Sequence, residues 1–170
     1  MAPRSSSSWL TAEQKLLSAV CDGNLGRVRE LLADGVHGAA ACVNAIVPHH
    51  NTTPLLQAVR DDHVTIVRAL IKGGADANIG LTAPLGAISI DNGDTPLLAA
   101  CYNGNAEIAA DLIGAGADVQ GTEQGTPLSM VMRQLDDAFL GQIEKDRLRS
   151  LLQLLRRSGA TSAGAYMPSH

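Results

Sequence analysis

The residues whose types could support chemistry are a few histidines and carboxylates close together in the first half of the chain. His49, His50 and His63, with Asp61 and Asp62, offer nitrogen and oxygen ligands of the kind that metal ions accept. Their spacing fits none of the usual zinc patterns, and no cysteine accompanies them. We therefore expect solvated residues on a loop and a turn, and no metal or other cofactor.

Other candidate catalytic groups also have simpler explanations. Asp136 and Asp137 are adjacent carboxylates, but neighbouring residues of a helix point in different directions, which favours a solvated surface over a paired acid and base. Cys21 and Cys101 lie among Ala and Val in predicted helices, which favours small core residues over nucleophiles. The sequence contains no phosphate loop, His-Glu-x-x-His or Gly-x-Ser-x-Gly motif. These patterns predict a chain that is not an enzyme.

Composition narrows the class of protein further. Hydrophobic residues make up 45% of the 170 residues but aromatic residues only 2%, so the core must be built from small aliphatic side chains, which suits closely packed helices. The net charge of −4 argues against general binding to nucleic-acid backbones. Three widely separated cysteines indicate reduced, mostly buried thiols instead of a disulfide framework.

The sequence also bears on the compartment. No stretch approaches the roughly 20 apolar residues that span a bilayer, so we expect no membrane contact. The first residues contain no secretory signal. We predict a cytoplasmic protein, with the nucleus as the alternative.

A repeated sequence decides where all these residues are placed. Thr53-Pro-Leu-Leu recurs as Thr95-Pro-Leu-Leu and as Thr126-Pro-Leu-Ser, and the first two copies align without gaps at an offset of 42 residues. An N-terminal copy fits an offset of 39 but lacks Thr-Pro, as an end unit can. It aligns through Leu16, Ala19, Val28, Leu31, Leu32 and Gly35.

Each copy is predicted to form two short helices. The Thr hydroxyl can cap the first helix, and Pro suits the first helical position because its missing N–H would have no partner there. The second helix has apolar residues at helical spacing and ends at a glycine, the usual left-handed cap. In the turn between the helices, Gly23 and Gly104 share a position with Asp62, so we predict a positive φ at Asp62.

The two ends of the repeated region differ from its middle. Thr11 and Gln14 have the spacing of a capping box at the first helix. The last copy has about a dozen extra residues around 136–145. Its closing helix carries an apolar face and ends with Arg156 and Arg157, which suit the helix dipole.

These motifs resemble the ankyrin-repeat family over about residues 11–161, with 53–78 and 95–120 as two well-preserved copies. The family's His after Thr-Pro-Leu is replaced by Leu56, Leu98 and Ser129, and the offsets exceed the usual repeat length of about 33. The resemblance implies an all-α solenoid of stacked helix–turn–helix units with long β-hairpin or loop fingers. The units would be about 11–44, 45–86, 87–120 and 121–161, between disordered tails at 1–10 and 162–170.

The surplus residues fall in the connectors 36–52 and 77–94. The apolar stretch 79–90 is unsuited to a free loop, so it either folds back onto the repeats, which we favour, or contacts a partner.

The resemblance also implies a function: a non-catalytic module, expected to be monomeric, that binds a protein partner through the concave face and finger tips. The corresponding finger residues are His49, His50, Thr52, Asp91, Asn92, Asp94, Glu123 and Gln124, and the helix residues are Arg60, Asp61, Tyr102, Asn103, Arg133 and Gln134. Tyr102 is the strongest single candidate because amphipathic aromatics are frequent binding hot spots.

Three alternatives stay open. The chain could be a regulatory or inhibitory subunit of an enzyme complex, or an enzyme whose pocket is formed by the long insertions. Nucleic-acid binding is the weakest, because the five basic and two acidic residues of 144–157 are adequately explained as a solvated helix surface.

Overall fold

The computed structural model describes residues 10–33, 42–47, 50–80, 95–121, 126–137 and 139–161. Within these ranges the regular elements are helices, and the β-pairing consists of one isolated antiparallel bridge between Val47 and Thr52. The predicted all-α class is therefore confirmed. No described helix is both long enough and apolar enough to cross a membrane.

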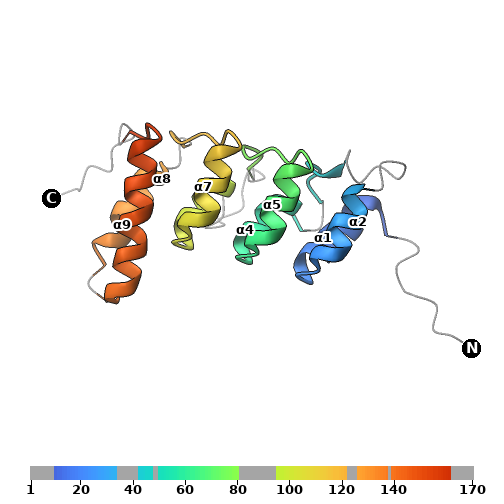
Figure 1. Cartoon of the computed structure of the whole chain (residues 1–170), viewed down its shortest axis with the longest axis horizontal. Coiled ribbons are helices and arrows are strands. Elements are labelled where there is room, and N and C mark those ends of the chain that lie inside the picture. Colours follow the sequence, from blue (N-terminus) through green and yellow to red (C-terminus); the bar gives the residue numbers. More distant parts are fainter. Residues whose placement is uncertain are drawn as a thin grey trace, which may run out of the picture. The chain divides into compact units, whose positions relative to one another are not determined.

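The chain divides into two compact units, Met1–Ala75 and Asp76–His170. Among the described residues, each unit contains two pairs of helices, which Figure 1 colours blue to green in the first unit and yellow to red in the second. The first unit holds α1 (Ala12–Cys21), α2 (Leu25–Ala33), α4 (Pro54–Arg60) and α5 (Val64–Lys72). The second holds α6 (Pro96–Tyr102), α7 (Ala106–Gly114), α8 (Pro127–Leu135) and α9 (Gln142–Arg157).

The Thr-Pro motifs begin helices as predicted. Thr53, Thr95 and Thr126 are the N-caps of α4, α6 and α8, and each hydroxyl accepts a hydrogen bond from a backbone N–H in the first turn. Thr11 and Gln14 form the expected capping box at α1. These hydroxyls satisfy amides that no helical carbonyl can reach, so the motif fixes the first residue of each helix.

The turn between paired helices also has the predicted conformation. Asp62 has φ of +60°, beside +64° at Gly23 and +66° at Gly104. The three residues hold the same left-handed position in their repeats, which confirms the alignment at this turn. After the second helices the chain again turns left-handed at glycine, with φ of +90° at Gly74 and Gly116.

Packing in both units follows one plan. α1 contacts α2 and α4, and α5 contacts α2 and α4; in the second unit α6 contacts α7 and α8, and α9 contacts α7 and α8. No helix of this length could shelter its apolar stripe alone, so paired helices must pack on the next pair. Leu56 and Leu98, at the family's His position, are buried and contribute apolar packing there. The largest fully buried side chains include Leu16, Leu55, Leu56, Ile66 and Leu70 in the first unit and Leu97, Ile108, Leu112, Leu151 and Leu155 in the second.

Amide side chains link successive repeats inside each unit. The Asn44 side chain donates a hydrogen bond to the carbonyl oxygen of Gly74 at 3.2 Å, and the Asn78 side chain donates to Gly116 at 3.0 Å. Gln120 does the same to Gly159 at 2.8 Å. Each bond satisfies a carbonyl just after a helix end. Asn78 and Gln120 hold equivalent positions at the offset of 42, but no sequence motif indicated a role for these amides.

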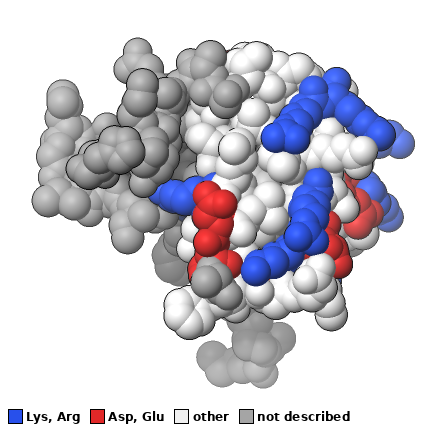
Figure 2. Space-filling model, turned by 90° about the vertical axis from the view of Figure 1, so that its left-hand side faces the viewer, with Lys and Arg blue, Asp and Glu red and all other residues white. Residues whose placement is uncertain are grey.

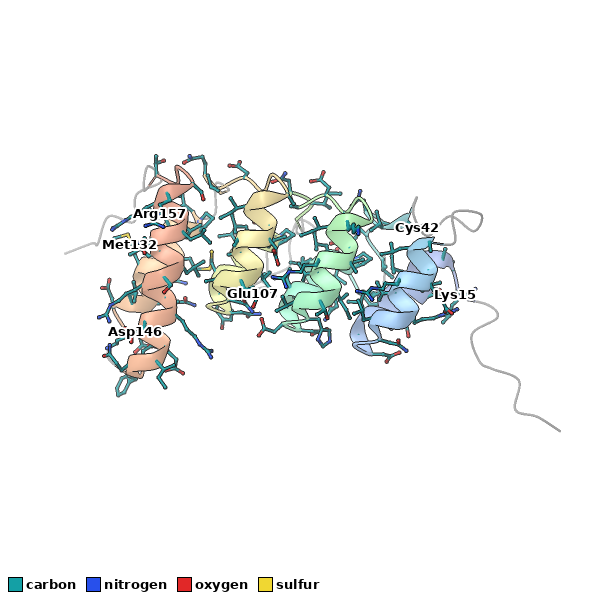
Figure 3. The ribbon with its side chains drawn as sticks, in the orientation of Figure 1. Lys15, Cys42, Glu107, Met132, Asp146 and Arg157 are labelled. Carbon is teal, nitrogen blue, oxygen red and sulfur yellow. The ribbon has the colours of Figure 1, made fainter. Side chains whose placement is uncertain are left out.

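The extra residues of the last repeat lengthen its second helix. α9 has 16 residues, whereas α5 and α7 have 9 each. Its buried face is Leu148, Leu151 and Leu155, and Arg156 and Arg157 lie in its last turn as expected. In Figure 3, Asp146 lies in the second turn of this longer helix, and Arg157 is its last residue.

Candidate protein-interaction surface

The C-terminal ends of the first helices place side chains of different repeats at equivalent positions, where the buried part of each helix ends. α4 and α6 are seven residues long, and nearly all of each helix is buried until its last residue. That last residue is Arg60 in α4 and Tyr102 in α6. Because the chain turns directly afterwards, the next residue, Asp61 or Asn103, is an exposed C-cap.

In the second unit, four of the predicted binding residues lie together. The Tyr102 side chain is 68% exposed at the end of α6. The side-chain amide of Gln134 in α8 donates a hydrogen bond to the carbonyl oxygen of Tyr102 at 2.9 Å, which ties the two helix ends together. Asn103 and Arg133 adjoin this pair in sequence and are exposed. The result is a small surface with one aromatic ring, one cation and two amides.

In the first unit, the equivalent position is occupied by different chemistry. Asp61 is exposed, and its Oδ2 accepts a hydrogen bond from the Gln57 side chain at 2.9 Å, while Arg60 is half-buried. Cys21 lies at the end of α1, in the position of Arg60 and Tyr102. The predicted core placement of Cys21 is therefore wrong: the offset of 39 puts it at Arg60, one residue beyond the position of the buried Cys101.

The pKa of each of the three thiols is raised, which disfavours the nucleophilic thiolate form. Burial raises the pKa of the Cys101 thiol to about 12. Partial desolvation, and then the charges of Asp61 and Asp22, raise the pKa of Cys21. Desolvation and the neighbouring Glu13 likewise raise the pKa of the half-buried Cys42. Because the thiolate is the reactive form, these shifts oppose nucleophilic chemistry near neutral pH.

The predicted finger residues differ in exposure, and most of them lie outside the described residues. His50 is exposed, in the turn that the Val47–Thr52 bridge closes. Thr52 is 1% exposed and its hydroxyl donates to the carbonyl oxygen of Thr53 at 3.3 Å. Thr52 therefore lies at the buried end of this turn, and its predicted exposure on the surface is wrong. The remaining finger predictions, together with most of both connectors, lie outside the described residues: His49, Asp91, Asn92, Asp94, Glu123 and Gln124.

The candidate metal and acid–base groups are placed as ordinary structural residues. His63 is half-buried, and its imidazole lies over the turn at Gly23, where an added Cβ would come within 3.3 Å of Nε2. Asp136 caps α8, and Asp137 accepts a hydrogen bond from the amide of Phe139 at 2.9 Å. Within the described ranges, no three His, Cys, Asp or Glu residues are grouped so that they could hold a metal ion.

The loop before α9 and the first turn of α9 expose two apolar side chains for which the sequence patterns had suggested no role. Phe139 is 97% exposed and Ile143 is 74% exposed. Both belong to the extra segment of the last repeat. Their apolar character among 136–145 was the available signal, since an insertion with no core to fill has no structural need for them.

The comparison with known proteins agrees with the repeat pattern. Residues 55–113, from α4 through most of α7, match the family model for ankyrin repeats (many copies). No curated protein matches the chain. The matched segment contains the whole Thr95-Pro-Leu-Leu motif and the last two residues of the earlier motif, Leu55 and Leu56. It also includes the left-handed turn positions Asp62 and Gly104. Residues 55–113 are therefore similar to ankyrin repeats, in agreement with the resemblance that the sequence motifs carry.

Proposed function

We propose that the chain is a non-catalytic module that binds a protein partner through the exposed ends of the first helices and the finger tips of a stacked repeat array. Ankyrin repeats generally mediate interactions between proteins. The observation that carries the proposal for this chain is Tyr102, a large side chain left 68% exposed where the rest of α6 is buried.

The surroundings of Tyr102 suit a binding hot spot. The hydrogen bond from Gln134 to the backbone carbonyl of Tyr102 holds the helix end that carries the aromatic ring, so this part of the backbone is already ordered before binding. Asn103 and Arg133 supply polar groups around it. An aromatic centre with a polar surround is the usual composition of a protein–protein hot spot.

The exposed basic residues of the last repeat favour a protein partner over a nucleic acid. Figure 2 looks onto the side that carries α9, where several Lys and Arg side chains lie next to Asp and Glu and one basic group at the upper right lies apart from them. Arg149, for example, pairs with Asp146 at 2.8 Å. A phosphate backbone needs an uninterrupted run of cations, which this mixed surface does not supply.

The proposal is tested by affinity purification from the native cell with three baits: the natural chain, Tyr102→Ala and Ile143→Ala. Ile143 is a matched control because it is an exposed apolar residue of the same unit, outside the helix-end surface. We expect one partner to be retained by the natural chain and the control, and to bind Tyr102→Ala about 30-fold more weakly when measured with the purified pair. Equal affinity of all three baits for every partner refutes the proposal. If the partner is an enzyme, a change in its turnover on binding identifies the chain as a regulatory subunit.

A further inference from the structure

A groove lies between α2 and α5, the second helices of the first two repeats, away from the first-helix ends. It has a volume of about 560 Å³ and is lined by Arg29, Leu32, Ala33, Thr65, Arg68, Ala69, Lys72 and Gly73. This volume falls in the range of clefts that hold organic ligands, roughly 300–1,000 Å³, and exceeds what a single ion needs. The described lining residues include three cations and no carboxylate.

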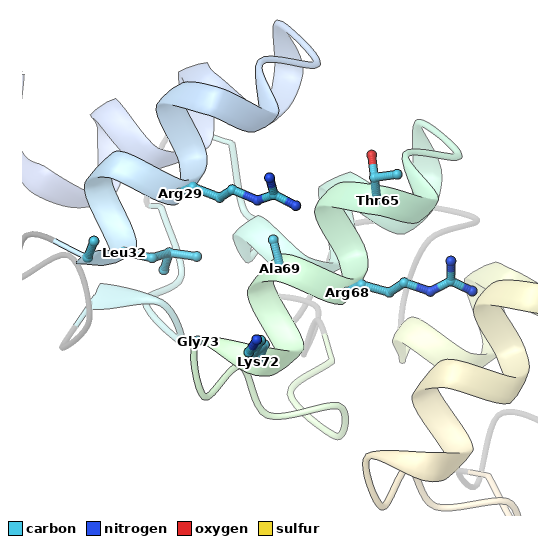
Figure 4. A pocket seen from close by; sticks show the side chains of 8 residues that line it. Arg29, Leu32, Thr65, Arg68, Ala69, Lys72 and Gly73 are labelled. Carbon is cyan, nitrogen blue, oxygen red and sulfur yellow. The ribbon is translucent and has the colours of Figure 1, made fainter.

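One of the basic positions is repeated. Arg29 and Arg68 are 39 residues apart, which is the offset of the first two repeats, so they hold the same outward position on successive second helices. In Figure 4 the side chain of Arg29 leaves α2 toward α5, above Ala69, and Lys72 stands beside Gly73 at the end of α5. The acid nearest to Arg29 in sequence, Glu30, is already paired with Arg27 at 2.6 Å. Cations therefore dominate a local surface of a chain whose net charge is −4.

The floor of the groove is apolar. Leu32 packs so closely on Gly73 that a Cβ added there would meet both Leu32 methyl carbons at 3.1 Å. Leu32 and Ala69 are only partly buried, so their outer surfaces face the groove. An apolar floor offers no hydrogen bond to an isolated inorganic anion. The lining has no aromatic ring on which a nucleic-acid base could stack.

We propose that this groove binds an acidic peptide segment of a partner protein, in which one apolar side chain rests on Leu32 and Ala69 while flanking carboxylates pair with Arg29 and Lys72. Charge complementarity carries the assignment, because Arg–carboxylate pairs are strong and directional and an apolar contact adds specificity. The site is separate from the Tyr102 surface and does not depend on the function proposed for it.

The probe for the test is a fluorescent hexapeptide with the sequence Glu-Glu-Leu-Glu-Glu-Leu, titrated with the full chain and followed by anisotropy. Two chain variants are compared: Arg29→Gln and, as a control, Arg147→Gln, which removes the same charge from an exposed position of α9. We expect saturable binding that Arg29→Gln weakens about tenfold, as for loss of a charged hydrogen bond, while Arg147→Gln changes it less than about twofold. Backbone amide shifts on binding should centre on Leu32, Ala69 and Gly73.

Several results would overturn the proposal. It fails if the natural chain shows no saturable binding of the peptide, if Arg29→Gln and Arg147→Gln weaken that binding equally, or if the amide shifts centre on α9. A single-stranded oligonucleotide that binds more tightly than the peptide and is equally sensitive to Arg29→Gln would assign the groove to nucleic acid instead. Tyr102→Ala should leave the peptide affinity unchanged, which separates this site from the proposed helix-end surface.

Discussion

The left-handed turn between paired helices can be tested with one substitution made at two glycines of the same repeat. Gly104 lies in the turn between α6 and α7 with φ of +66°, and Gly114 is the last residue of α7. An added methyl group meets only ordinary contact at Gly104, with Leu148 Cδ2 at 3.6 Å, and nothing within 4 Å at Gly114. Replacement of each by Ala therefore reports backbone conformation, with little steric effect.

The expected magnitudes follow from two opposing contributions. Ala restricts the unfolded chain at both sites, which stabilises the folded protein by about 0.4–1 kcal/mol where the native conformation suits Ala. At Gly104 the left-handed conformation costs an L-residue about 1–2 kcal/mol. Gly104→Ala should thus lower the free energy of unfolding by about 1 kcal/mol, whereas Gly114→Ala should raise it by about 0.5 kcal/mol. The unfolded-chain contribution cancels in the difference between the two variants.

The assay is urea unfolding at 25 °C followed by far-ultraviolet circular dichroism. The second repeat carries Asp62 at φ of +60°, so Gly104→Asp should cost less than Gly104→Ala, because Asp tolerates this region better. If Gly104→Ala and Gly114→Ala shift the unfolding free energy by the same amount and in the same direction, the assignment of left-handed strain at this turn is wrong.

Two further predictions concern the second unit. Thr95→Ala removes the hydroxyl that accepts a hydrogen bond from the Leu98 amide at 3.3 Å and should lower the free energy of unfolding by about 1 kcal/mol. Thr95→Ser keeps a hydroxyl and should retain most of the stability. Urea unfolding measures both variants, and equal losses would contradict a capping role. Cys101 is protonated in the folded chain to about pH 12, but its ordinary pKa is 9.0, so the unfolded form loses the proton first and stability should fall as pH rises above about 9. Cys101→Ala should reduce this loss of stability at high pH. In a chain with Cys21 and Cys42 replaced by Ser, a thiol-reactive disulfide reagent at pH 8 should react with Cys101 only after unfolding. Rapid reaction with the folded chain would contradict the burial of Cys101.

The starts of the first helices and the turn between paired helices could be predicted because the responsible interactions are local. Thr53 caps an amide three residues ahead, and Asp62 takes its left-handed conformation within a turn of a few residues. An alignment of repeats within one sequence was enough to place both. The ankyrin resemblance followed from the same motifs, and the match over residues 55–113 agrees with it.

Residue exposure was predicted less well, because it depends on neighbours far along the chain. Thr52 looked like part of a finger tip, yet its pairing with Val47 places it in the core. Cys21 looked like a core thiol, yet it ends α1 one position beyond the buried register. The repeat offset already contained the correct position of Cys21, but composition alone suggested the wrong one.

By itself, the amino-acid sequence determined where the first helix of each pair begins, where the chain turns left-handed between paired helices, and that paired helices must pack on other pairs. Tertiary structure alone decided which side chains of different repeats meet: the amide of Gln134 on the carbonyl of Tyr102, that of Asn78 on Gly116, and Arg29 over the groove beside α5. The physical reason is range. Capping and turn conformation act over three or four residues, whereas these contacts join residues about 30 to 40 positions apart and exist only once the helices have packed.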